Sequence, residues 1–380
     1  MTSLVLNNVA LMPGRQGAPL CDVAISDGLI KSIGSDGISA DGVIDFGGDY
    51  LCPGFFDVQV NGGGSVLFND TPDVDTIRTI GAAHRSFGTT SFLPTLISDD
   101  LDVIDRAMRA VEDAITAGVP GVVGIHIEGP FLNVRRKGIH DASKFAQLTD
   151  EAIRLLSSLE VGRTLVTLAP ECCRLEDIEA LQQRGVVISA GHTDATYEQM
   201  TKALDAGVTG FTHLYNAMSP LHHREPGVVG AALDSQTAYC GLIADGHHVS
   251  AAALRIALRA RPLDRFVLVT DAMPGVGTSL KRFALSGQTI MIKDGLCVDE
   301  SGTLAGSNLD MASAVRQLVE MTDVEPAAAI AMATANPAQF MGLAQSGTIR
   351  KGSRADLVRL DRQLALKQVW QGGQPVLPEA

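Results

Sequence analysis

The stretch QQRGVVISAGHTD, residues 182–194, contains the pattern that decides the fold. A helical segment ends at Gln183-Arg184, the single glycine Gly185 follows, and the apolar run Val186–His192 comes next. Glycine is the residue that most readily ends a helix, and a short apolar run rich in β-branched side chains is typical of a buried strand. The stretch therefore predicts a helix, a turn and a buried strand that ends on a histidine.

Seven other runs of this kind accompany Val186–His192, and helical segments such as Asp99–Gly118 separate most of them. Eight strands alternating with helices favour a (β/α)8 TIM-like barrel of the α/β class. The alternative is a doubly wound sheet, which usually has fewer strands, and no G-x-G-x-x-G motif follows the first run. The other runs are Phe55–Val60, Thr89–Thr95, Val122–Glu128, Thr164–Ala169, Gly210–Tyr215, Tyr239–Ala244 (short and interrupted by Gly241) and Phe266–Asp271.

Both ends of the chain carry short β patterns outside this alternation. Near the N-terminus, Asp27-Gly28 joins two apolar runs, which predicts a hairpin. Near the C-terminus, we expect strands at Gly347–Ile349, Ala355–Leu360 and Gln368–Trp370. We expect the two ends to pair as one small β-sandwich domain. The predicted division is 1–50 (β domain, N-terminal part), 51–343 (barrel) and 344–380 (β domain, C-terminal part).

Composition excludes several classes of protein. The formal net charge of −13 argues against a nucleic-acid partner, which requires a basic face. No apolar run reaches roughly 18 residues, so no membrane span is expected. The N-terminal residues lack the pattern of a signal peptide, and the six cysteines contain no C-x-x-C pair. We therefore expect a cytoplasmic protein whose cysteines are small buried hydrophobes.

Polar side chains gather at the C-terminal ends of the predicted strands. Glu128, His192, His213 and Asp271 each stand at or near such an end. In a barrel enzyme these ends meet at the face that carries the active site. Two imidazoles and a carboxylate suit zinc, with iron or another divalent metal as the alternative, and three ligands leave room for a water. We therefore expect Glu128, His192 and His213 to hold one divalent ion per subunit.

Other histidines have plainer explanations. His126 lies two residues before Glu128 and so faces the same side of the strand, one layer deeper. We interpret it as a core or supporting residue, and His84, in a helical segment, as surface or packing. His222, His223 and His247 also fit an ordinary polar loop.

Longer motifs resemble a known family. Pro53–Asp57 at the first strand, together with a β domain built from both chain ends, resembles the amidohydrolase superfamily. Within it, motifs over nearly the whole chain resemble the N-acetylglucosamine-6-phosphate deacetylase family. These motifs are His126–Asn133, Lys137–His140, Gly191–Thr193, His213–Met218, Arg224–Gly227 and Leu304–Ser307.

This resemblance implies a reaction and roles for individual residues. The reaction is hydrolysis of N-acetyl-D-glucosamine 6-phosphate to D-glucosamine 6-phosphate and acetate, in amino-sugar catabolism. A metal-activated water attacks the acetamide, Asp271 takes its proton as general base and returns it to the leaving amine, and His140 stabilises the carbonyl oxygen. Arg224 and His248 are implied phosphate contacts, with Arg224 reaching in from the partner of a homodimer. The other implied contacts are Ile139, His140, Asn216, Ala217 and a segment that we expect to be a loop, Leu304, Ala305 and Gly306.

The first strand departs from the pattern of many amidohydrolases. Those proteins carry His-x-His there for a second metal, whereas this sequence has Gln59-Val60-Asn61. Amides are poor metal ligands compared with imidazole. Some deacetylases of the resembling family share the Gln-x-Asn variant and are regarded as single-metal enzymes. We therefore interpret Gln59 and Asn61 as a vestigial second metal position.

Two other functions remain open from the sequence. A cyclic amidase or deaminase would keep the fold, but such enzymes usually carry His-x-His and often a carboxylated lysine where Glu128 stands. A non-catalytic sugar-phosphate sensor would need no general base, which Asp271 supplies.

Overall fold

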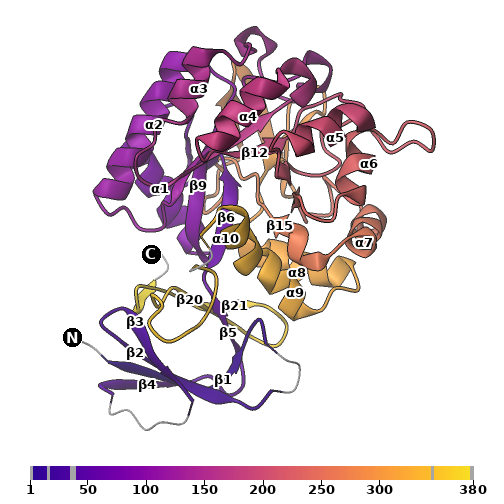
Figure 1. Ribbon diagram of the computed structural model, residues 1–380. Helices are drawn as coiled ribbons and strands as arrows, with labels where there is room; N and C mark the ends of the chain where they lie inside the picture. The colour runs from indigo at the N-terminus through magenta and orange to yellow at the C-terminus, as the bar shows by residue number, and fades with distance from the viewer. Residues whose placement is uncertain (1–2, 15–17, 35–39, 344–345, 377–380) are drawn as a thin grey trace.

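Eight parallel strands form the central sheet of the computed structural model, which describes residues 3–14, 18–34, 40–343 and 346–376 (Figure 1). Each strand pairs with the next along the chain, so the order never reverses as it would in a doubly wound sheet. All eight predicted runs are confirmed as strands, the short seventh included. They are β6 (Phe55–Val60), β9 (Thr89–Ile97), β10 (Gly124–Glu128), β11 (Arg163–Leu168), β12 (Val187–Ala190), β13 (Gly210–Phe211), β14 (Tyr239–Leu242) and β15 (Phe266–Leu268).

The sheet closes into a barrel just beyond the end of β15. A parallel bridge joins Val60 to Ala272. On either side of it, the Asp271 amide donates to the Gln59 carbonyl at 3.0 Å and the Asn61 amide donates to the Ala272 carbonyl at 2.9 Å. Closure therefore fixes Asp271 beside Gln59 and Asn61, which lie far from it in the sequence.

Helices cover the outside of the barrel (Figure 1). In α2, Ile104, Met108 and Val111 are buried, as the 3.6-residue period predicts. Gly185 precedes β12 with φ +82°, a conformation that a side chain would strain. The helices are α1 (Val74–Arg85), α2 (Leu101–Thr116), α3 (Asp150–Leu156), α4 (Leu175–Gln183), α5 (Tyr197–Asp205), α6 (Gly227–Asp234), α7 (Ala251–Ala260), α8 (Met311–Met321), α9 (Pro326–Met332), α10 (Ala335–Phe340) and the 3₁₀ turns Val134–Arg136, Ala142–Lys144, Pro170–Cys172 and Leu263–Arg265.

The two chain ends form a separate β domain below the barrel in Figure 1. The C-terminal β20 pairs antiparallel with the N-terminal β5, and β1 is shared between the two parts of the sheet. Residues from both parts, including Leu6, Leu51, Leu357 and Trp370, bury one apolar core between them, as a sandwich does. The strands are β1 (Leu4–Leu11), β2 (Cys21–Ser26), β3 (Leu29–Ile33), β4 (Gly42–Asp45), β5 (Tyr50–Pro53), β20 (Leu357–Leu360), β21 (Leu366–Gln371) and β22 (Gln374–Val376).

Two expectations for the secondary structure were wrong. Gly347–Ile349 is not a strand, because Gly347 has φ +71° and packs against the backbone of Thr334. The Leu304–Gly306 segment is not a loop, since it lies in an antiparallel four-stranded sheet after the eighth barrel strand. That sheet comprises β16 (Arg282–Leu285), β17 (Gln288–Lys293), β18 (Leu296–Val298) and β19 (Leu304–Ser307), and a further small pair is β7 (Gly62–Gly63) and β8 (Val66–Leu67).

In the described part of the chain, no helix combines the length and the apolar character that crossing a bilayer requires.

Candidate active site

A cavity of about 360 Å³ opens at the C-terminal ends of the barrel strands. It brings together most of the side chains that the sequence singled out, together with several apolar ones that it did not. The cavity is lined by Asn61, Ile97, Glu128, Gly138, Ile139, His140, His192, His213, Asn216, Ala217, Ile243, His248, Asp271, Met273, Gly302, Thr303, Leu304 and Gly306.

Glu128, His192 and His213 form a tight buried cluster in this cavity. Glu128 Oε1 lies 3.1 Å from His192 Nε2 and 3.0 Å from His213 Nε2, and the two nitrogens are 3.1 Å apart. Glu128 ends β10, whereas both histidines follow short strands with left-handed backbones, at φ 48° and 34°. Such strained backbone is typical of functional sites.

The protonation of His192 indicates what the cluster can bind. Its Nδ1 lies 2.8 Å from the Arg136 carbonyl oxygen, which only accepts, so Nδ1 carries the proton. In the neutral ring Nε2 can then present an electron pair to a cation, whereas without a cation a proton on Nε2 donates to Glu128 Oε1. Ligands about 2.1 Å from a tetrahedral ion lie roughly 3.4 Å apart, close to the spacing observed. Three electron-pair donors at this separation fit a divalent cation.

Charge within the cluster shifts its pKa values. Burial opposes ionisation of Glu128, but hydrogen bonds from His192 and His213 outweigh it and hold the pKa of Glu128 well below its usual range. For His213, burial acts to lower the pKa, and the hydrogen bond and charge of Glu128 raise it overall. A carboxylate that remains ionised beside two imidazoles is the state that a metal site needs.

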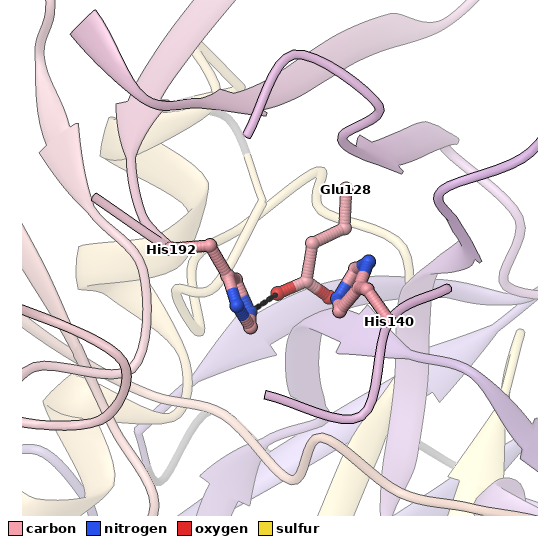
Figure 2. A group of neighbouring side chains, drawn as sticks. All are labelled: Glu128, His140 and His192. Carbon is pink, nitrogen blue, oxygen red and sulfur yellow. Dashed lines mark hydrogen bonds and ion pairs between the residues drawn. The ribbon is translucent and has the colours of Figure 1, made fainter. Parts of the chain in front are cut away.

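His140 lies next to the cluster but differs from its members. Figure 2 shows Glu128 between His192 and His140, and one ligand atom from each of these three lies within 4.8 Å of the others, so they also form a possible metal-binding group. Burial first, and then the charge of His192, lower the pKa of His140 to about 3, which keeps the ring neutral. Its Nδ1 is 2.8 Å from the hydroxyl of Ser98.

Asp271 lies next to the cluster and is held by two amides. Asn61 Nδ2 donates to its Oδ1 at 2.7 Å and Gln59 Nε2 does so at 3.1 Å. Gln59 Nε2 also donates to Glu128 Oε2 at 3.2 Å. Burial, and then the charge of Glu128, raise the pKa of Asp271 to about 6. Both amides thus direct their hydrogens at the acids.

Some predicted residues lie outside the cavity. Arg224 is exposed on the segment before α6 and is not part of the site of its own chain. Ala305 is buried in a small apolar core with Ile290 and Cys297 instead of facing the cavity. His248 does line it, and the sequence missed its partner Asp245, whose Oδ2 lies 2.7 Å from His248 Nδ1.

His126 and His84 do not line the cavity. His126 is buried beneath it between two threonines, with Nε2 2.8 Å from Thr167 Oγ1 and Nδ1 3.3 Å from Thr95 Oγ1. His84 is fully buried and its Nε2 lies 2.9 Å from the Gly62 carbonyl oxygen. These contacts agree with the interpretation of His126 as a core or supporting residue. For His84, packing is right and a surface position is wrong.

Glu171 supports the loop of His192, and the sequence gave no sign of it. Its carboxylate accepts hydrogen bonds from the Thr193 hydroxyl at 2.5 Å, the Asp194 amide at 2.6 Å and Asn133 Nδ2 at 2.8 Å. Glu171 thereby ties the two residues that follow His192 to Asn133. Three donors use most of the roughly four lone-pair sites that a carboxylate offers.

We expect Glu171→Gln to lower both the melting temperature and the affinity for a divalent metal, the latter by about tenfold. The glutamine amide turns one acceptor into a donor that faces other donors, which costs about 1–3 kcal/mol. Thermal unfolding and metal titration measure the two effects. Glu179→Gln, an exposed position on α4, is the matched control. Wild-type metal affinity in Glu171→Gln would contradict the supporting role.

Comparison with known protein families shows which family the chain belongs to. The model of the amidohydrolase family matches residues 50–376. An N-acetylgalactosamine-6-phosphate deacetylase of Shewanella sp. (strain ANA-3) is 42% identical over 360 residues, covering 93% of this chain and 91% of the relative. The N-acetylglucosamine-6-phosphate deacetylase of Homo sapiens is 38% identical over 350 residues, covering 87% and 84%.

Solved structures agree with this placement. An N-acetylglucosamine-6-phosphate deacetylase from Pasteurella multocida superposes with a TM-score of 0.93 at 29% identity, covering 98% of this chain and 99% of that one. A variant from Mycobacterium smegmatis, solved in complex with N-acetyl-D-glucosamine-6-phosphate, has a TM-score of 0.90 at 31% identity and covers 99% of each chain. The chain is therefore a hydrolase that belongs to the amidohydrolase family, in its group of amino-sugar-phosphate deacetylases.

Proposed function

We propose that the protein hydrolyses N-acetyl-D-glucosamine 6-phosphate to D-glucosamine 6-phosphate and acetate, in amino-sugar catabolism. One observation carries the proposal: the cluster of Glu128, His192 and His213 shares a cavity with Asp271 and His140. This combination supplies three metal ligands, a carboxylate able to move a proton and a neutral donor. The similarity to deacetylases over most of the chain supports the choice of substrate.

The ligand set points to a single divalent ion, zinc in our proposal, with iron as the alternative. Glu128, His192 and His213 would hold it, because all three present electron pairs at one point. When bound, the metal would increase the acidity of water and polarise the substrate carbonyl.

Asp271 is proposed to move the proton. Its pKa of about 6 lets it accept a proton from the attacking water and then return it to the leaving amine. Gln59 and Asn61 hold one carboxylate oxygen, Oδ1, which leaves Oδ2 free for this exchange. His140 is proposed to donate to the carbonyl oxygen as negative charge develops on it.

Substrate recognition is proposed to come from the rim of the cavity. We assign His248, Asn216, Ala217, Ile139, Leu304 and Gly306 to sugar and phosphate contacts because they line it. Arg224, exposed on its own chain, would complete the phosphate site of the partner in a homodimer, and its guanidinium suits phosphate geometry. Ala305 is reassigned to the packing of β19.

The organisation and location of the chain complete the proposal. We retain domain boundaries near residues 51 and 343, between the β domain and the barrel. The cytoplasm is the proposed location, and it is supported by six cysteines that are all free thiols.

Acetate release from N-acetyl-D-glucosamine 6-phosphate, followed with purified protein and added zinc, tests the function. We expect stoichiometric acetate and a free amine, and no turnover of the sugar without phosphate at the same concentration. Tight binding without acetate would support the sensor. Turnover of a cyclic amide alone would support the other amidohydrolase class.

N-acetyl-D-galactosamine 6-phosphate is a second candidate substrate, favoured by the 42% identity to the Shewanella relative. The two sugars differ only in the configuration at C4, away from the acetamide. Measuring kcat/KM for both with the same preparation ranks them. A ratio above about ten, or roughly 1.4 kcal/mol, identifies the preferred epimer.

The decrease of kcat/KM at acid pH should follow the protonation of Asp271. A carboxylate acts as a base only when ionised, so kcat/KM is full above its pKa and falls as the pH drops through it. Burial and the charge of Glu128 place that pKa at about 6, and a cation nearby would lower it. We therefore expect the acid limb at or below about pH 6. A limb centred above about pH 7 would contradict this assignment.

A further inference from the structure

Ser98 is a buried residue directly after β9 that neither the sequence motifs nor the proposed chemistry uses. Its hydroxyl lies 2.8 Å from His140 Nδ1 and its backbone amide 3.4 Å from the same nitrogen. The Glu128 carbonyl oxygen is a longer alternative for the hydroxyl, at 3.5 Å. A Cβ at Gly129 would come within 2.2 Å of Ser98 Oγ, so only glycine at that position leaves room for the hydroxyl.

The amide is the informative partner, because a backbone N–H can only donate. A proton on His140 Nδ1 would point at the hydrogen of the Ser98 amide. Nδ1 therefore accepts, from the amide and from the hydroxyl, and the single proton of the neutral ring sits on Nε2.

We propose that Ser98 is a positioning residue that fixes His140 in the tautomer with its proton on Nε2, so that His140 faces the cavity as a hydrogen-bond donor and not as a metal ligand. The inference rests on the proposed function, in which His140 donates to the substrate carbonyl. A metal ligand needs a bare nitrogen, which this tautomer does not present to Glu128 and His192.

The adjacent His192 shows the opposite arrangement. Its Nδ1 faces a carbonyl oxygen, that of Arg136, and so carries the proton, which leaves Nε2 bare. The two rings lie 4.4 Å apart between centroids and are both buried. The partner of Nδ1 therefore sets the tautomer of each ring. The Arg136 carbonyl leaves Nε2 of His192 free to bind a metal, whereas Ser98 leaves the proton of His140 on Nε2, where it can be donated.

Nitrogen NMR of histidine-labelled, zinc-loaded protein tests the tautomer without reference to activity. His140, assigned by its loss in His140→Gln, should show a protonated Nε2 and a bare Nδ1. In Ser98→Ala, which keeps only the longer amide contact, the two nitrogens should move toward a mixture of tautomers. Ser98→Thr, which keeps a hydroxyl, should resemble the wild type more closely than Ser98→Ala does. A wild-type ring protonated on Nδ1 would overturn the inference.

Kinetics then separate positioning from simple packing. We expect Ser98→Ala to lower kcat about tenfold, the effect of one lost hydrogen bond, with KM within about twofold. In a His140→Gln background the same change should have no further effect, because Ser98 acts through His140. Equal losses in both backgrounds would contradict positioning, and Ser157→Ala, at the end of α3, controls for loss of a hydroxyl. Full activity of His140→Gln alone would refute the role of His140 as a donor in the proposed function. The nitrogen spectrum would still test separately whether Ser98 sets the tautomer of His140.

Discussion

Replacing Asp271 with asparagine should lower kcat by at least about a thousandfold and leave KM close to that of the wild type, because general acid and base catalysis contributes about 10²–10⁴-fold to each proton transfer it serves. The exchange removes the ability to take up a proton but keeps one side-chain oxygen. That oxygen can still accept from Asn61 and Gln59, so the geometry of the cavity should persist. Acetate release under saturating substrate measures the loss.

Two further measurements test whether the loss of activity in Asp271→Asn comes from the loss of proton transfer. The acid limb of the pH profile should be absent from the residual activity of Asp271→Asn, since its titrating group is gone. Metal content should equal that of the wild type, because Asp271 lies outside the ligand cluster. Asp113→Asn, an exposed position on α2, is the matched control. Turnover within about tenfold of the wild type would remove Asp271 from the mechanism.

Replacing Glu128 with glutamine should abolish both metal retention and turnover. Glu128 Oε1 is the only oxygen of the ligand cluster and supplies its negative charge, 3.1 and 3.0 Å from the two imidazole nitrogens. A neutral amide also sets its own N–H groups against Gln59 Nε2, which now donates to Glu128 Oε2. We expect metal affinity to fall by more than the ~100-fold that loss of a supporting hydrogen bond can cost.

Metal analysis after dialysis and an acetate assay on the same sample measure the two effects of Glu128→Gln together. Glu160→Gln, an exposed position between α3 and β11, should behave as the wild type in both. Partial activity that returns when excess metal is added would agree with weakened binding. A full complement of tightly held metal would show that other residues hold the ion, and the group of Glu128, His140 and His192 would then have to be reconsidered.

The barrel could be predicted because its signal is periodic. Runs such as Val186–His192 recur after a helix and a glycine, and a parallel barrel follows from the alternation. The same topology explains why Glu128, His192, His213 and Asp271 could be grouped from sequence. The ends of parallel strands meet at one face, whatever the distance along the chain.

The segments whose secondary structure was predicted wrongly lack such periodicity. The sheet of β16 to β19 is short and half exposed, and Leu304–Gly306 contains a glycine with φ +62°, so the segment resembled a loop. Gly347–Ile349 resembled a strand in composition, but its conformation is set by contact with Thr334. Both outcomes depend on tertiary packing that no local pattern records.

The residues that support the site could not be predicted from the sequence for a different reason. Ser98, Glu171 and the Arg136 carbonyl act through a few hydrogen bonds to segments far away in the sequence. Ser and Glu are common in loops, and a carbonyl belongs to every residue, so their identity has no predictive value. Their roles follow only once the distances to His140 and His192 are known.

Acetate release as a function of metal occupancy tests the central claim most directly. Apoprotein, prepared with a chelator, is titrated with zinc while bound metal and turnover of N-acetyl-D-glucosamine 6-phosphate are followed in the same samples. The cluster of Glu128, His192 and His213, together with Gln59 and Asn61 in place of a His-x-His pair, predicts that turnover rises in proportion to occupancy and is complete at about one ion per chain. Full turnover in the metal-free protein, or activity that appears only with a second ion, would contradict this account.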